Sequence, residues 1–299
     1  MRTSLVIAVT TALLMPFFHG AAVSAAPSDA PLKIVATLPI LKDFAEQVGR
    51  EHVAVRTLIT GLENEHSYSP KPSDLKALSE ARLLLEIGLG LEVWVQGLVK
   101  NAGNAQLRLV TTSDGIGLIR DRASHSASAG NPHIWLDPEN AKAMVRHIAN
   151  ALISTDPPRK DAYLKNLADY LQRLDRTQAG LLELVASLRD RRIITHHAAW
   201  PYFARRFGFQ IKGEILPNMG LEPSSTHLAS LATHIKSGKI KVILSEPQFN
   251  QKVVQALADE TGARIVVLSP LPGTIKGTDT YLALLDYNVT TLVTALEIP

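Results

Sequence analysis

The sequence predicts an α/β protein of two lobes with parallel sheets, joined by one long, rigid helix. Short apolar segments that are typical of buried strands alternate with segments of helical periodicity. This alternation favours βαβ units and a parallel sheet. One helical segment of about 30 residues interrupts the alternation near the middle of the chain. At 299 residues, the chain is long enough for two domains with sizeable cores.

The first 25 residues have the features of a secretory signal peptide. Arg2 supplies a positive charge, residues 4–18 are apolar but short for a membrane span, and Val23-Ser24-Ala25 offers small residues for cleavage before Ala26. An N-terminal membrane anchor is the alternative. Because the chain has no cysteine, it forms no disulfide bond and lacks the residue that a lipid anchor requires. We therefore expect a periplasmic protein that is neither lipid-anchored nor embedded in the membrane.

The charge of the chain gives no indication of a nucleic-acid partner. The formal net charge is +3, the basic residues are spread along the chain, and aromatic residues make up 5% of it. Nucleic-acid-binding proteins concentrate basic charge on one face or stripe. We expect no nucleic acid to bind.

The N-terminal lobe is predicted over residues 26–155. The expected strands are residues 32–37, 53–59, 82–87 and 107–111. The first strand is followed by an amphipathic helix over residues 40–48, and a Pro-rich stretch opens a second helix that runs through Leu75 and Leu78. Residues 120–130 are rich in Ser, Ala and Gly and predict a mobile loop, which contains His125.

A stiff segment follows that loop and holds a histidine. Pro132 biases Asn131 toward an extended conformation and fixes its own φ angle. Asp137 and Pro138 have the pattern of a helix start, with Asp as the N-cap and Pro at the first helical position. His133 lies between the loop and the capped helix, so its imidazole should hold one direction.

The long helix is predicted over residues 156–190 and begins at Asp156-Pro157-Pro158. From Leu164 to Leu188, apolar residues recur at alternating spacings of three and four. A coiled-coil dimer is one interpretation of this spacing. We favour a single helix that packs along both lobes of a monomer.

The alternation resumes in the C-terminal lobe, residues 191–299. The expected strands are residues 192–195, 209–212, 241–244 and 264–268, and the expected helices are residues 199–207, 224–235, 250–261 and 281–296. The two lobes are therefore similar, and both are expected to be Rossmann-like.

Several side chains that can bind a metal lie just past the predicted strands or at the start of helices. They are His66, His133, His196, His197, Glu246 and Asp279. Open α/β sheets bind ligands at this edge. Two imidazoles from one lobe, with one imidazole and one carboxylate from the other, would form a four-ligand site in the cleft that suits Zn²⁺. Residue types alone do not decide between the two adjacent histidines or between the two carboxylates.

Five stretches resemble the solute-binding proteins of zinc and manganese ABC importers, in that family's order and spacing. They are His66-Ser67-Tyr68-Ser69-Pro70-Lys71-Pro72-Ser73-Asp74, Asn131-Pro132-His133-Ile134-Trp135-Leu136-Asp137-Pro138, residues 195–203, Ser245-Glu246-Pro247-Gln248-Phe249 and Asp279-Thr280-Tyr281. The second motif is highly specific. The resemblance extends from about Ile34 to the C-terminus.

The resemblance implies one metal ion per chain and assigns its ligands. The implied ligands are His66, His133, His197 and Asp279. His196 would be a neighbour or an alternative ligand, and Glu246 would orient a ligand from behind, as carboxylates commonly do for metal-bound histidines.

Two departures from the family pattern concern fine geometry. Ala198 stands where an acidic residue is frequent, and Pro201 stands where Gly is common. Many zinc-specific members also carry a His-rich insertion, whereas the loop over residues 120–130 is short. Its single histidine, His125, is either solvated or a weak auxiliary metal contact.

The resemblance therefore implies a periplasmic protein that binds Zn²⁺ and delivers it to an inner-membrane ABC permease. A metal chaperone is a further candidate partner. Manganese-type members place a carboxylate where His197 stands, so the single carboxylate of this set favours zinc over Mn²⁺ or Fe²⁺. An exported zinc hydrolase with Glu246 as general base is a weaker alternative. We expect no enzymatic activity.

Overall fold

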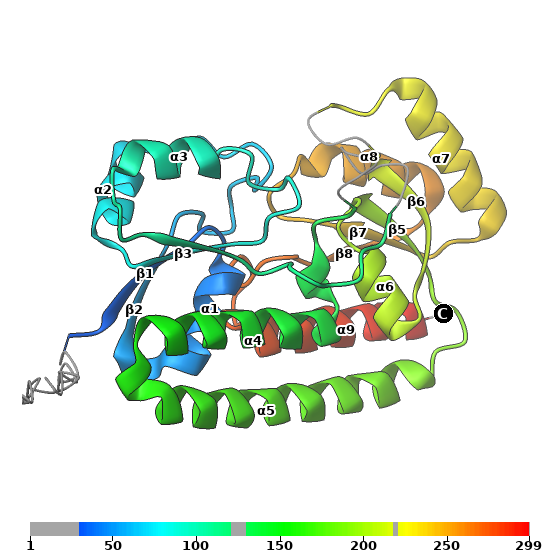
Figure 1. Cartoon of the computed structure of the whole chain (residues 1–299). Helices are drawn as coiled ribbons and strands as arrows, with labels where there is room; N and C mark the ends of the chain where they lie inside the picture. Colours follow the sequence, from blue (N-terminus) through cyan, green and yellow to red (C-terminus); the bar gives the residue numbers. More distant parts are fainter. Residues whose placement is uncertain (1–29, 121–129, 218–220, 299) are drawn as a thin grey trace, which may run out of the picture.

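The computed structural model describes residues 30–120, 130–217 and 221–298, which form two α/β lobes above a layer of long helices (Figure 1). Each lobe contains a four-stranded parallel sheet, with strand orders β2-β1-β3-β4 and β6-β5-β7-β8. The predicted fold class is therefore confirmed. The predicted signal peptide and His125 lie outside the described residues.

The N-terminal lobe has the strands expected from the sequence. They are β1 (Leu32–Ala36), β2 (Val53–Thr57), β3 (Leu83–Glu86) and β4 (Arg108–Thr111). The central strand β3 is buried throughout, as the apolar run of a strand covered on both faces requires. The helices are α1 (Pro39–Gly49), α2 (Pro72–Glu80) and α3 (Val95–Ala102). The sequence did not predict α3, which is short and includes the weak helix former Gly97.

The C-terminal lobe contains every predicted element. Its strands are β5 (Arg192–His197), β6 (Gln210–Leu216), β7 (Val242–Ser245) and β8 (Arg264–Val267), and its helices are α6 (Pro201–Phe207), α7 (Ser225–Gly238), α8 (Gln251–Thr261) and α9 (Tyr281–Glu297). Strand β6 continues to Leu216, beyond the end predicted from its apolar residues. It pairs with β5 along this length, with a register shift between Ile193 and Thr195.

The long helix is α5 (Lys160–Ala186), which follows α4 (Pro138–Thr155) and one 3₁₀ turn. It packs against α1, α4 and α9 and runs beneath both lobes (Figure 1). Its buried face includes Tyr163 and Tyr170, whereas Leu164 is 42% exposed. The predicted row of leucines therefore coincides only in part with the buried face of the helix. Among the helices of the described ranges, none is both long and apolar enough to cross a membrane.

The main apolar core continues from one lobe into the other. It includes Phe44 of α1, Trp135 before α4, Leu174 of α5, Phe203 of α6 and Leu285 of α9. A second, smaller cluster lies within the C-terminal lobe around β5, β6 and β7. Because the lobes share a core, their separation would expose apolar surface to water, at a cost of about 25 cal/mol per Å².

Candidate metal centre

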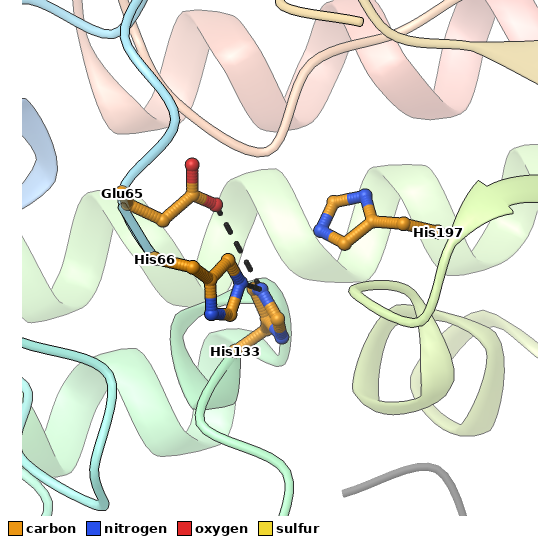
Figure 2. Close-up of side chains that lie close together, drawn as sticks. All are labelled: Glu65, His66, His133 and His197. Atoms are coloured by element: carbon orange, nitrogen blue, oxygen red, sulfur yellow. Dashed lines mark hydrogen bonds and ion pairs between the residues drawn. The ribbon is translucent and has the colours of Figure 1, made fainter. Parts of the chain in front are cut away.

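Three histidines and one glutamate from distant parts of the chain come together in the structure (Figure 2). They are Glu65, His66, His133 and His197, and each offers one ligand atom that lies within 4.8 Å of the others. Glu65, His133 and His197 are buried, and His66 is partly buried. The donor set is three imidazole nitrogens and one carboxylate oxygen.

Glu65 and His66 lie on the connection between β2 and α2. The backbone N–H of His66 donates to Asn64 Oδ1 at 2.9 Å, a local turn that polar residues favour in such loops. Beyond it, Tyr68 donates its hydroxyl proton to Asp74 Oδ2 at 2.7 Å, and Asp74 also accepts from the backbone at the start of α2. The end of the loop is thus anchored to the first turn of that helix.

His133 lies in the stiff segment that the sequence predicted. Asn131 Oδ1 accepts from the backbone N–H of His133 and from its Nδ1, both at 3.0 Å. Asp137 accepts from the backbone N–H of Glu139 at 3.0 Å, so the predicted helix cap is confirmed. Nδ1 of His133 is hydrogen-bonded to Asn131, and Nε2 on the other side of the ring faces the cluster. This nitrogen lies 3.2 Å from His66 Nε2 and 3.8 Å from Glu65 Oε1.

His197 is the last residue of β5 and belongs to the other lobe. Its Nδ1 donates to Glu246 Oε1 at 2.7 Å, and Glu246 follows directly after β7. Trp200 Nε1 donates to the same oxygen at 3.1 Å. His197 Nε2 is buried and has no hydrogen-bond partner among the described residues. Figure 2 shows this ring directed toward the other three side chains.

Burial and neighbouring charges shift the pKa values of Glu65 and His197. Burial raises the pKa of the Glu65 carboxyl, and the opposing effect of nearby His197 offsets this only in part. Burial alone would lower the pKa of His197, but the carboxylates of Glu246 and Glu65 raise it above its ordinary value. Both Glu65 oxygens are buried without a hydrogen bond within the described part of the chain. Such groups are rare in folded proteins, and a bound cation would satisfy them.

Contacts between the lobes set the distance between His133 and His197. Asn131 Nδ2 donates to the carbonyl of Ala198 at 2.6 Å, directly after His197. Tyr202 of α6 donates its hydroxyl proton to the carbonyl of Asn131 at 3.0 Å. Arg206 of α6 donates to Asp137 at 2.6 Å, and Arg205 adds a contact to the same carboxylate at 3.3 Å. The segment that holds His133 is therefore fastened to the strand end that holds His197.

The structure brings together three of the four ligands that the resemblance implies, and it does not bring Asp279 to them. Asp279 is exposed and lies outside the cluster. The next two residues hold its backbone in place. Thr280 caps α9, and the backbone N–H of Tyr281 donates to Asp43 Oδ2 at 2.8 Å. Glu65 supplies the carboxylate of the cluster instead.

His196 and Glu246 occupy supporting positions. Successive side chains of a strand point to opposite faces, so His196 points away from the cluster when His197 points into it. Its Nδ1 accepts from the backbone N–H of Glu246 at 3.3 Å, and its ring lies 4.9 Å from that of Phe249. Burial lowers the pKa of His196 to about 4, which keeps this ring neutral. Glu246 contacts His197 from behind, as expected of a residue that orients a ligand.

Glu65 is the residue that sequence reasoning missed. It directly precedes His66 in the loop after β2, and an acidic residue beside a candidate ligand was the available signal. The same loop also contains Glu63, which accepts from Thr60 at 2.9 Å. Sequence alone does not separate these two glutamates, because only the packed loop shows that one is buried and the other is not.

Comparisons with known proteins identify the family of the chain. The family model described as "Zinc-uptake complex component A periplasmic" matches residues 34–295. The chain is 29% identical over 259 residues to the high-affinity zinc uptake system protein ZnuA of Bacillus subtilis (strain 168), covering 82% of this chain and 80% of the relative. It is 28% identical over 272 residues to the manganese-binding lipoprotein MntA of Halalkalibacterium halodurans, covering 89% of each.

A solved structure shares the fold over most of both chains. The crystal structure of the 138–173 ZnuA deletion mutant with zinc bound has a TM-score of 0.82 and 31% sequence identity, and the match covers 90% of this chain and 100% of that one. Solute binding, rather than catalysis, is the role of this family, which excludes the hydrolase alternative. The chain thus belongs to the family of periplasmic zinc-uptake components, the metal-binding proteins of ABC importers.

Proposed function

We propose that this protein captures Zn²⁺ in the periplasm with Glu65, His66, His133 and His197 and delivers it to a membrane permease. The observation that carries the proposal is the convergence of buried donor atoms without partners. Both oxygens of Glu65 and Nε2 of His197 lack a hydrogen bond among the described residues, and they lie within one cluster with two further imidazoles. One divalent cation would satisfy all of them.

The donor set supports zinc rather than manganese. Zn²⁺ is commonly bound by four ligands in a tetrahedral arrangement, with histidine nitrogens and carboxylate oxygens at about 2.0–2.2 Å. Mn²⁺ prefers more oxygen ligands, and it stands below zinc in the affinity order of nitrogen and oxygen sites. Three imidazoles against one carboxylate therefore favour Zn²⁺.

Mn²⁺ or Fe²⁺ is the alternative cargo, because the relatives include proteins named for zinc uptake, for manganese binding and for iron binding. Relatives of nearly equal identity, 29% and 28%, are named for zinc uptake and for manganese binding. Metal competition distinguishes the two. We expect bound zinc to remain in a large excess of Mn²⁺, and its displacement would contradict the zinc assignment.

Elemental analysis of the purified protein, beside two histidine variants, tests the site itself. We expect one zinc per chain. The variant His133→Ala removes a ligand, so its zinc affinity should fall by more than the roughly 10–100-fold typical of a supporting residue. The matched control is His234→Ala on α7, an exposed histidine outside the cluster, which should keep full zinc content. Equal zinc content in the two variants would contradict the proposal.

A further inference from the structure

Glu246 is a fully buried carboxylate behind one of the proposed metal ligands. It is 0% exposed, and its Oε1 accepts from His197 Nδ1 at 2.7 Å and from Trp200 Nε1 at 3.1 Å. Its Oε2 accepts from Gln248 Nε2 at 3.2 Å. Each oxygen of Glu246 thus accepts a hydrogen bond from at least one side chain. This arrangement suits an ionised carboxylate, which accepts hydrogen bonds and donates none.

The partner of His197 differs from that of His133 in charge. His133 Nδ1 meets the neutral amide oxygen of Asn131, whereas His197 Nδ1 meets a carboxylate. An imidazole that donates to a carboxylate is fixed in the tautomer whose Nε2 lone pair is free, and that nitrogen becomes a stronger donor to a metal. The carboxylate therefore acts on the metal through His197.

The two buried carboxylates of the site match a dication in charge. Glu65 and Glu246 are both 0% exposed, and in the described part of the chain neither forms an ion pair with a lysine or an arginine. Another carboxylate, that of Glu214 on β6, acts on His197 from a partly exposed position, where solvent screens its charge. With neutral imidazoles, a divalent ion would make the buried site electrically neutral, and a monovalent ion would leave it negative.

We infer that Glu246 is a positioning residue that favours a divalent ion over a monovalent ion at the site. It holds His197 and supplies the second buried negative charge beside the ion. This inference rests on the proposed function of the same site. It assigns to a residue that does not touch the metal a part in choosing which class of ion binds.

The test compares Zn²⁺ with Ag⁺, two ions with filled d shells, in the wild-type protein and in Glu246→Gln. Affinities are measured by calorimetric titration of each metal-free protein with each ion. We expect zinc affinity to fall about 10–100-fold in Glu246→Gln. Silver affinity should fall much less, so the ratio of zinc to silver affinity drops by about tenfold or more.

Two further variants separate charge from packing. Glu246→Asp keeps the negative charge but moves the carboxylate away from His197. The affinities for zinc and for silver should both fall, and the ratio of the two should stay near that of the wild type. Glu92→Gln makes the same change at another buried carboxylate, which accepts from Thr37 and from two backbone N–H groups outside the cluster. It should leave the ratio unchanged. If Glu246→Gln does not fold, as judged by circular dichroism, Glu246→Asp still tests the inference.

A loss of affinity that is equal for the two ions in Glu246→Gln would overturn the inference, because it would show a merely structural contact. A ratio that drops in Glu246→Asp would do the same. In either case, a wild-type protein that binds one zinc leaves the proposed function intact. A wild-type protein that binds no zinc overturns the proposed function, and the inference with it.

Discussion

The side chain of Glu65 is fully buried, and its two oxygens accept no hydrogen bond within the described residues. A carboxylate in such surroundings is costly to ionise, because desolvation penalises the charged form. In the proposed site, a proton therefore competes with the metal for this carboxyl. At the residue scale, the burial that makes this carboxyl costly to ionise also leaves its two oxygens without a hydrogen bond among the described residues, and the proposed cation would satisfy both.

The stability of the metal-free protein should therefore fall as the pH rises. Burial raises the pKa of Glu65 in the folded state above its ordinary value of 4.5, so the folded chain binds more protons than the unfolded chain over the interval between the two values. His197, with a pKa raised above 6.5, acts in the same direction at higher pH. Since Glu65→Gln removes the first contribution, its melting temperature should fall less than that of the wild type between about pH 5 and pH 8.

Thermal unfolding of the metal-free proteins across this pH range measures the difference. Glu63→Gln is the matched control, because it makes the same change in the same loop at a glutamate whose pKa is lowered by hydrogen bonds from Thr60. Glu63 titrates below this interval, so its variant should follow the wild type. Parallel curves for wild type and Glu65→Gln would contradict the argument.

At the scale of elements, the loop between β2 and α2 packs in close contact with the loop that leads to α9. Gly61 has a φ angle of +102°, and a Cβ atom there would lie 2.8 Å from Thr274 Cγ2 and 3.3 Å from the carbonyl oxygen of Pro272. Only glycine combines this backbone conformation with such a close approach at little cost. The position of Glu65 and His66, a few residues further on, depends on this contact.

Gly61→Ala should therefore weaken zinc binding as well as stability. The added methyl group must displace the β2–α2 loop or the loop that leads to α9, so we expect a loss of about 1–2 kcal/mol in the free energy of unfolding. We expect zinc affinity to fall by about tenfold. Chemical denaturation and zinc titration give the two values.

The control for Gly61→Ala is Gly90→Ala on the next loop of the same lobe. Gly90 has a φ angle of +79°, but a Cβ atom there would meet nothing within 4 Å. This variant should lose stability through backbone strain and keep its zinc affinity. The double variant Gly61→Ala with Thr274→Ser removes the nearest clashing methyl group and should recover part of the affinity.

At the scale of the whole molecule, hydrogen bonds near the site join the two lobes. Trp135 Nε1 donates to the carbonyl of Pro270 at 2.7 Å, and the hydroxyl of Tyr281 donates to the carbonyl of Trp135 at 2.8 Å. α5 packs against helices of both lobes (Figure 1). Together with the continuous core, these contacts oppose a wide opening between the lobes.

Removal of the metal should therefore change the loop and leave the lobes in place. Small-angle scattering of the metal-free and zinc-loaded proteins should give the same radius of gyration and lobe separation, because the shared core stays buried. Amide hydrogen exchange should become faster in the β2–α2 loop and stay unchanged in α5. A large change of lobe separation would show that release occurs by domain opening instead.

Local patterns determined most of the fold. Strands appear where apolar segments were found, and α4 begins at the Asp137-Pro138 cap because both the side-chain acceptor and the fixed φ angle are encoded there. The exceptions are instructive. The sequence did not predict α3, because this helix is short and contains a glycine. On α5, Tyr170 joins the buried face beside the predicted leucines, because its ring packs against that of Phe44 on α1.

The sequence by itself predicted that His66, His133 and one of the adjacent pair His196 and His197 would stand at strand ends or helix starts, where parallel sheets present side chains to a ligand, and the family resemblance favoured His197. Only the tertiary structure decided the fourth side chain of the cluster. Glu65 is buried in a loop that packs at Gly61 against the loop leading to α9, whereas Asp279 is exposed and the backbone two residues after it is bound by Asp43 of α1. Residue type and spacing indicate which side chains can bind a metal. The burial of those side chains and the distances between them depend on how the two lobes pack.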